Sequence, residues 1–152
     1  MSDRCDYQVN VRDVDVQLGI ACVQVMTTQL CFNICKLEDS RLANAEIRDL
    51  PSRVKENISD SLQYSCLHWL DHFCRPPANH DQCVLVLGSL KTFFEELYGL
   101  FWVEVLSIMG TVPIGVPRLR KLLSWVMVSP AASLDSKVTS TGCRIRIQRL
   151  LR

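Results

Sequence analysis

Glycine and proline are scarce in this chain, with six of each among 152 residues. Their scarcity excludes collagen-like and low-complexity proteins. Charged residues make up 22% and hydrophobic residues 48%, which excludes a disordered acidic chain. The length fits one domain, or one piece of a larger one. Composition alone does not identify a function, so the argument depends on local motifs.

Motifs for nucleotide and nucleophile chemistry are also missing. A phosphate-binding loop needs closely spaced glycines followed by Lys and Ser or Thr, and the nearest stretch, GSLKT at 88–92, lacks the first glycine and the Gly-Lys order. No Gly-x-Ser-x-Gly elbow occurs. The sequence therefore predicts no cofactor, no catalytic residues and no enzymatic activity.

The first sixteen residues, MSDRCDYQVNVRDVDV, contain no apolar core of the kind a signal peptide needs. The eight cysteines are therefore interpreted as thiols of a reducing compartment, and we expect a cytoplasmic protein. The least charged long stretch, 97–117, carries Glu104 near its middle, together with three glycines and prolines at 113 and 117. A central carboxylate is costly in a bilayer, so we predict no membrane span.

Charge is unevenly distributed along the chain. Residues 1–111 contain 9 basic and 15 acidic side chains, a net charge of −6, whereas residues 112–152 contain 8 basic and 1 acidic, a net charge of +7. A basic end can bind nucleic acid, but no aromatic residue follows Trp125 to stack on bases. We predict no nucleic-acid partner and a disordered basic tail at 129–152, whose RIRIQRLLR end fits a frayed helix or an edge strand.

Apolar residues recur with helical spacing along 18–35, 60–74, 83–109 and 118–126. This pattern predicts an all-α bundle of four or five helices over 13–128, after a flexible N-terminus at 1–12. The alternating apolar residues of 14–22 compete as a possible strand. Gly99 is a candidate break, Gly110 a candidate helix cap, and Pro117 the expected start of the last helix.

Histidine and cysteine residues gather between 68 and 83. His68 and His72 stand at i and i+4 on one predicted helix, and Cys74, His80 and Cys83 follow. A small helical zinc protein using His68, His72, Cys74 and Cys83 is the alternative interpretation. Against it, no Cys-x2-Cys pair occurs, and Trp69 occupies the place where zinc proteases carry a glutamate.

Several large side chains are candidates for protein contact. Trp69, Phe101 and Trp102 lie on predicted helices, where most aromatics belong to a core and those left outside mark an interface. Glu104, between two valines, is expected to pair with a basic group or to cap a contact with another domain. The apolar stretch 93–109 is the expected surface for self-association or for a protein partner.

Four stretches together resemble one family: MTTQLCFNICKLEDS at 26–40, ISDSLQYSCLHWLDHF at 58–73, FFEELYGLFWVEVLSIMG at 93–110, and PRLRKLLSWV at 117–126. They resemble the helical segment that follows the NACHT module in fungal NOD-like receptor proteins, many of which carry WD repeats. The most specific run is Phe-Asn-Ile-Cys-x-Leu-Glu at 32–38.

The resemblance implies a helical linker between an ATPase and C-terminal repeats. The phosphate- and magnesium-binding motifs of that family would lie upstream, and none of their residues is in this chain. The resemblance therefore carries over no catalytic residue, and it ends after Val128. It implies an incomplete module whose apolar face, left without those neighbours, binds a protein partner or a second copy.

Overall fold

The computed structural model describes residues 11–39, 41–74, 77 and 79–128. The described part holds six α-helices, one short 3-10 helix and no strand, which confirms the predicted all-α class. The helices are α1 (Val11–Gln29), α2 (Leu50–Asn57), α3 (Asp60–Phe73), α4 (His80–Glu95), α5 (Tyr98–Ile108) and α6 (Val112–Val128), and η1 spans Asn44–Glu46. The predicted tail at 129–152 lies outside the described residues, as do residues 1–10.

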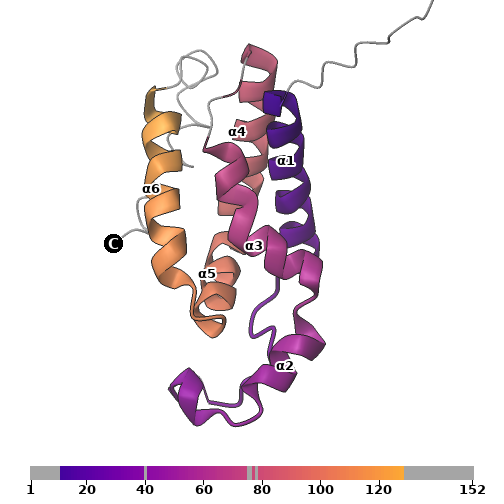
Figure 1. The fold of residues 1–152 in the computed structure, drawn as a ribbon, viewed down its shortest axis with the longest axis vertical. Helices are drawn as coiled ribbons and strands as arrows, with labels where there is room; N and C mark the ends of the chain where they lie inside the picture. Colours follow the sequence, from indigo (N-terminus) through magenta and orange to yellow (C-terminus); the bar gives the residue numbers. More distant parts are fainter. Residues whose placement is uncertain (1–10, 40, 75–76, 78, 129–152) are drawn as a thin grey trace, which may run out of the picture.

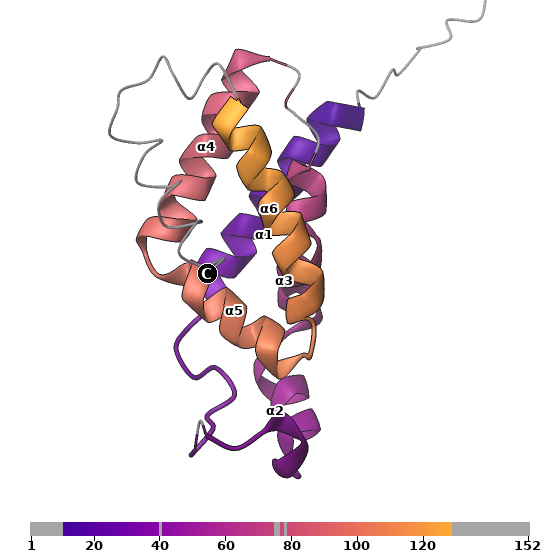
Figure 2. The same cartoon turned by 90° about the vertical axis from the view of Figure 1, so that its left-hand side faces the viewer.

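The helices form an elongated bundle (Figure 1). α1, α3 and α4 run beside one another, α6 lies on the opposite side of α3, and α2 with η1 extends from the lower end. Figure 2 shows α4 at an edge of the bundle. None of the helices in the described ranges is long and apolar enough to cross a membrane.

Residues 14–22, whose apolar pattern fitted either a strand or a helix, lie in the helix α1. Val16, Cys22, Val23 and Met26 are buried on one face of a helix, so the alternation at 14–22 does not produce a strand. The helix begins at Val11, which corrects the predicted flexible end at residue 12, and it ends at Gln29 rather than near residue 35. Asn33 and Lys36 adopt positive φ and turn the chain after Leu30.

Local signals explain the starts of the next helices. Pro51 falls in the first turn of α2, where its missing N–H costs nothing. Ser59 caps α3, because its side-chain oxygen accepts a hydrogen bond from the amide of Leu62. Asn79 caps α4 in the same way through the amide of Gln82.

Two helix boundaries lie at other residues than the sequence predicted. α4 and α5 separate at Leu97, which has φ 67°, rather than at Gly99. α6 begins at Val112, so Pro117 lies inside the helix instead of opening it. Gly110, with φ +69°, does follow the end of α5 as predicted, in a conformation that glycine adopts without strain.

The core is built around aromatic rings where α3, α4 and α5 meet. The Trp69 and Trp102 rings contact edge-to-face at 5.4 Å, and the Phe93 ring lies 5.0 Å from that of Trp69. The indole N–H of Trp102 donates to the carbonyl oxygen of Cys66 at 2.8 Å. Because this bond is buried, it fixes α5 against the middle of α3.

Candidate functional site

The outer face of α1 is the clearest unpartnered surface of the described bundle. Val11, Val14 and Leu18 are 60%, 41% and 40% exposed, and Ala21 is exposed beside them. They recur at i, i+3, i+7 and i+10, so they share one stripe of the helix. Asp13, Val14, Gln17, Leu18 and Ala21 line a shallow depression along this stripe. We call these four apolar residues the α1 outer stripe.

The inner face of α1 is apolar as well, and the exposed polar residues Asp13, Gln17, Gln24 and Thr28 lie between the two apolar faces on one side. The residues of the outer stripe are visible in the sequence. They are interspersed with the apolar residues that α1 buries, so the sequence alone does not separate the two sets. The sequence therefore pointed to 93–109 as a contact surface and did not single out the exposed residues of α1.

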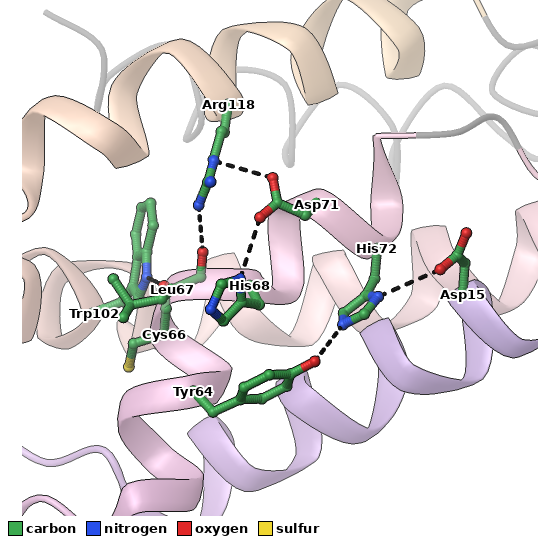
Figure 3. A network of polar contacts seen from close by, with 9 residues as sticks. All are labelled: Asp15, Tyr64, Cys66, Leu67, His68, Asp71, His72, Trp102 and Arg118. Carbon is green, nitrogen blue, oxygen red and sulfur yellow. Dashed lines mark hydrogen bonds and ion pairs between the residues drawn. The ribbon is translucent and has the colours of Figure 1, made fainter.

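A polar network borders the stripe at the contact of α1 with α3 (Figure 3). His72 Nδ1 lies 3.5 Å from a carboxylate oxygen of Asp15, and its Nε2 lies 3.1 Å from the hydroxyl oxygen of Tyr64. A neutral His72 satisfies both contacts when Nδ1–H donates to Asp15 and Nε2 accepts from Tyr64. The network thus joins two helices through a side chain that is mostly buried.

The network continues on the other side of α3 to α6. Asp71 lies 3.4 Å from His68 Nδ1 and 3.0 Å from Nε of Arg118, and Arg118 also donates to the carbonyl oxygen of Leu67 at 2.6 Å. These contacts position helices.

The proposed zinc ligands are not gathered into one site. Within the ranges that the structure describes, no group of three or more His, Cys, Asp or Glu side chains is placed to hold a metal ion. His68 and His72 contact Asp71 and Asp15, Cys74 ends α3, and Cys83 lies in α4. Burial raises the pKa of Cys74, which favours the thiol over the thiolate that zinc requires.

Burial also raises the pKa of other cysteine thiols in the bundle. Burial raises the pKa of Cys66 to about 12, with nearby Cys22 adding to the effect, and burial also raises the pKa of Cys22. Burial, followed by the charge of Glu104, raises the pKa of Cys35. The six cysteines within the described ranges are free thiols. The buried ones behave as small hydrophobic side chains rather than as nucleophiles.

The predicted contact residues divide between core and surface. Trp69 and Trp102 are buried, which removes them as contact residues of this bundle, and Phe101 is half-buried against the core. Phe93, Phe94, Val105 and Leu106 of the predicted surface 93–109 are also buried, whereas Leu97 and Leu100 are exposed. The exposed apolar part of the predicted surface is therefore reduced to Leu97, in the turn before α5, and Leu100, in the first turn of α5.

Glu104 makes a contact within the bundle that the sequence did not predict, and its predicted contact with another domain stays a prediction. Its carboxylate accepts the backbone N–H of Asn33 at 3.2 Å. The Asn33 side chain accepts from the amide of Leu37 at 2.7 Å and donates to that residue's carbonyl at 2.9 Å. Glu104 therefore anchors the turn after α1 to α5.

No protein-family model, curated protein or solved structure matches this chain.

Proposed function

We propose that this chain is a non-enzymatic helical interaction module that binds a protein partner or a second copy of itself. The observation that carries the proposal is the α1 outer stripe, where apolar side chains remain exposed on a helix whose other face is already packed. Covering apolar surface stabilises association by about 25 cal/mol per Å². Contiguous exposed apolar surface of this kind marks an interaction site.

The position of the module in a larger protein belongs to the same proposal. The four stretches that resemble the segment following a NACHT module correspond to the turn after α1, to α3, to α5 and to α6. Glu104 and Asn33, from two of those stretches, contact each other. Such a segment, located in the cytoplasm between an ATPase and its repeats, would use apolar outer faces to contact both neighbours.

Sedimentation velocity of the purified full chain between about 1 and 50 μM tests the proposal, since this range brackets affinities near 10 μM. We expect the wild type to sediment faster than a monomer as its concentration rises. The double variant Val14→Asp, Leu18→Asp should remain monomeric, because two buried carboxylates would oppose the contact.

The matched control is Ile114→Asp, which places the same charge on an exposed apolar position of α6 and should behave like the wild type. A wild-type chain that stays monomeric and binds no hydrophobic dye would overturn the proposal. Equal effects of the α1 and α6 variants would also contradict it.

A further inference from the structure

A second uncovered surface lies on α4, away from the α1 outer stripe. Its exposed residues recur along one side of the helix, and we call them the α4 outer face: Asp81, Val84, Leu85, Gly88, Thr92 and Glu96. Val84 and Leu85 are 43% and 51% exposed. A Cβ added at Gly88 would meet nothing within 4 Å, so this position of the face is open.

The charges of the α4 outer face have one sign. Asp81 stands near the first turn and Glu96 follows the last, while Lys91, the one Lys or Arg of α4, is half-buried. The two exposed apolar residues therefore lie one turn after Asp81, and Glu96 lies about three turns further along the helix. Two copies of this face packed against each other would bring like charges together, which disfavours a symmetric self-contact.

The end of the chain has the complementary pattern. Cys143, Ile147, Leu150 and Leu151 follow the spacing i, i+4, i+7 and i+8, which would place them on one side of a helix, whereas Ile145 would fall among the arginines. Four arginines, at positions 144, 146, 149 and 152, accompany them, and residues 143–152 contain no acidic residue. A basic amphipathic segment matches an apolar face with acidic ends.

Residues 129–142, which connect α6 with the segment 143–152, are long compared with α4. α6 ends at Val128, at the same end of the bundle as the beginning of α4 (Figures 1 and 2). The fourteen residues 129–142 can span up to about 48 Å when extended. The sixteen residues of α4 extend only about 24 Å. The extended connection is therefore about twice as long as α4.

We propose that residues 143–152 dock onto the α4 outer face of the same chain. The apolar residues cover Val84 and Leu85, and the arginines lie beside Asp81 and Glu96. The covalent tether makes the contact intramolecular, with an effective concentration on the order of millimolar, which favours this chain's own segment over a second copy. The proposal goes beyond the interaction module above, because it concerns a different face and leaves α1 uncovered.

Limited trypsin digestion of the full chain tests the docking. Peptide bonds after Arg144, Arg146 and Arg149 should be cleaved slowly in the wild type, with the cleavage followed by mass spectrometry. When opening is fast, cleavage follows the open population, so Leu85→Asp should raise the initial rate about tenfold or more. Asp81→Lys combined with Glu96→Lys should also raise it, which keeps the test valid if one variant folds poorly.

Ile114→Asp, with a comparably exposed apolar side chain on α6, is the matched control and should cleave like the wild type. Circular dichroism should show unchanged helix content in all variants. Equal initial rates in the wild type and in both α4 variants would overturn the proposal. Protection that increases with protein concentration would overturn it in favour of docking on a second copy. Sedimentation of the α1 variants is a separate readout, so the two proposals fail independently.

Discussion

Two glycines of the bundle have opposite surroundings. A Cβ at Gly19 would lie 2.3 Å from a ring carbon of Phe73, whereas one at Gly88 would meet nothing within 4 Å. Both residues are helical, so the propensity gain from alanine is about the same at each, near 1 kcal/mol. The difference in unfolding free energy between alanine variants at the two positions therefore reports how closely α1 approaches α3.

We predict that Gly19→Ala lowers the free energy of unfolding by about 1–3 kcal/mol, because the methyl group must displace the Phe73 ring in a packed core. Gly88→Ala should instead raise it by about 0.5–1 kcal/mol. Urea denaturation followed by circular dichroism measures both. A neutral or stabilising effect at Gly19 would contradict the close contact of α1 with α3.

The buried thiol of Cys66 couples stability to alkaline pH. Its folded-state pKa is raised from 9.0 to about 12, so the unfolded chain loses this proton first as pH increases. The stabilisation is fully present below pH 9 and is lost as pH rises from there toward 12, by up to about 1.4 kcal/mol per pH unit.

We expect the Cys66→Ala variant to be less stable at pH 7, because it leaves a small cavity, and to lose stability more slowly between pH 9 and 11. Cys31→Ala, which removes an exposed thiol, should keep the wild-type slope. Denaturant titrations at several pH values give the slopes. Parallel curves for the wild type and Cys66→Ala would refute the coupling.

At the scale of elements, a single arginine fixes α6 on α3. Arg118 contacts both Asp71 and the carbonyl oxygen of Leu67. Its side chain is partly exposed, so solvent screens the ion pair. The geometry nevertheless favours arginine, because Nε and a terminal nitrogen point at two different acceptors.

We predict that Arg118→Met lowers the free energy of unfolding by about 1 kcal/mol, while retaining the apolar stem of the side chain. Arg120→Met, at an exposed position of the same helix, should change it by less than about 0.5 kcal/mol. A double-mutant cycle with Asp71→Ala should give a coupling of about 0.2–1 kcal/mol. No measurable coupling would show that Arg118 acts through Leu67 alone.

The helices themselves could be predicted from sequence, but their breaks could not. Apolar periodicity located α3 almost to the residue, because the predicted stretch 60–74 corresponds to the helix Asp60–Phe73. Leu97 in the left-handed region has no local signal, since glycine is the residue usually expected there. The position of Pro117 inside α6 depends on Val112 and Pro113 having already started the helix.

The candidate site was predicted less well, for a related reason. Periodicity marks Trp69 and Trp102 as lying on helices, but it does not say which neighbour covers them. Glu104 pairs with a backbone amide 71 residues away in the chain, which no local pattern encodes. The α1 outer stripe became visible only when the opposite face of α1 was packed against α3.

At the scale of the whole molecule, the zinc interpretation gives an experimental test. We predict that neither added zinc nor a chelator shifts the thermal midpoint, because His68 and His72 contact carboxylates on different helices and Cys74 remains protonated. Thermal melts with equimolar zinc and with EDTA measure the shift. An increase of several degrees with zinc, abolished by His72→Ala, would restore the zinc interpretation.

The pairing of α1 with α3 has a consequence during synthesis. α1 is complete at Gln29, but Phe73, whose ring lies against Gly19, is added 44 residues later. At 5–20 residues per second, the ribosome needs roughly 2–9 s for that stretch. Throughout this interval the apolar inner face of α1, with Val16, Cys22, Val23 and Met26, lacks the α3 residues that cover it in the folded chain. The nascent chain is therefore most exposed to aggregation, and most dependent on chaperones, before residue 73 emerges.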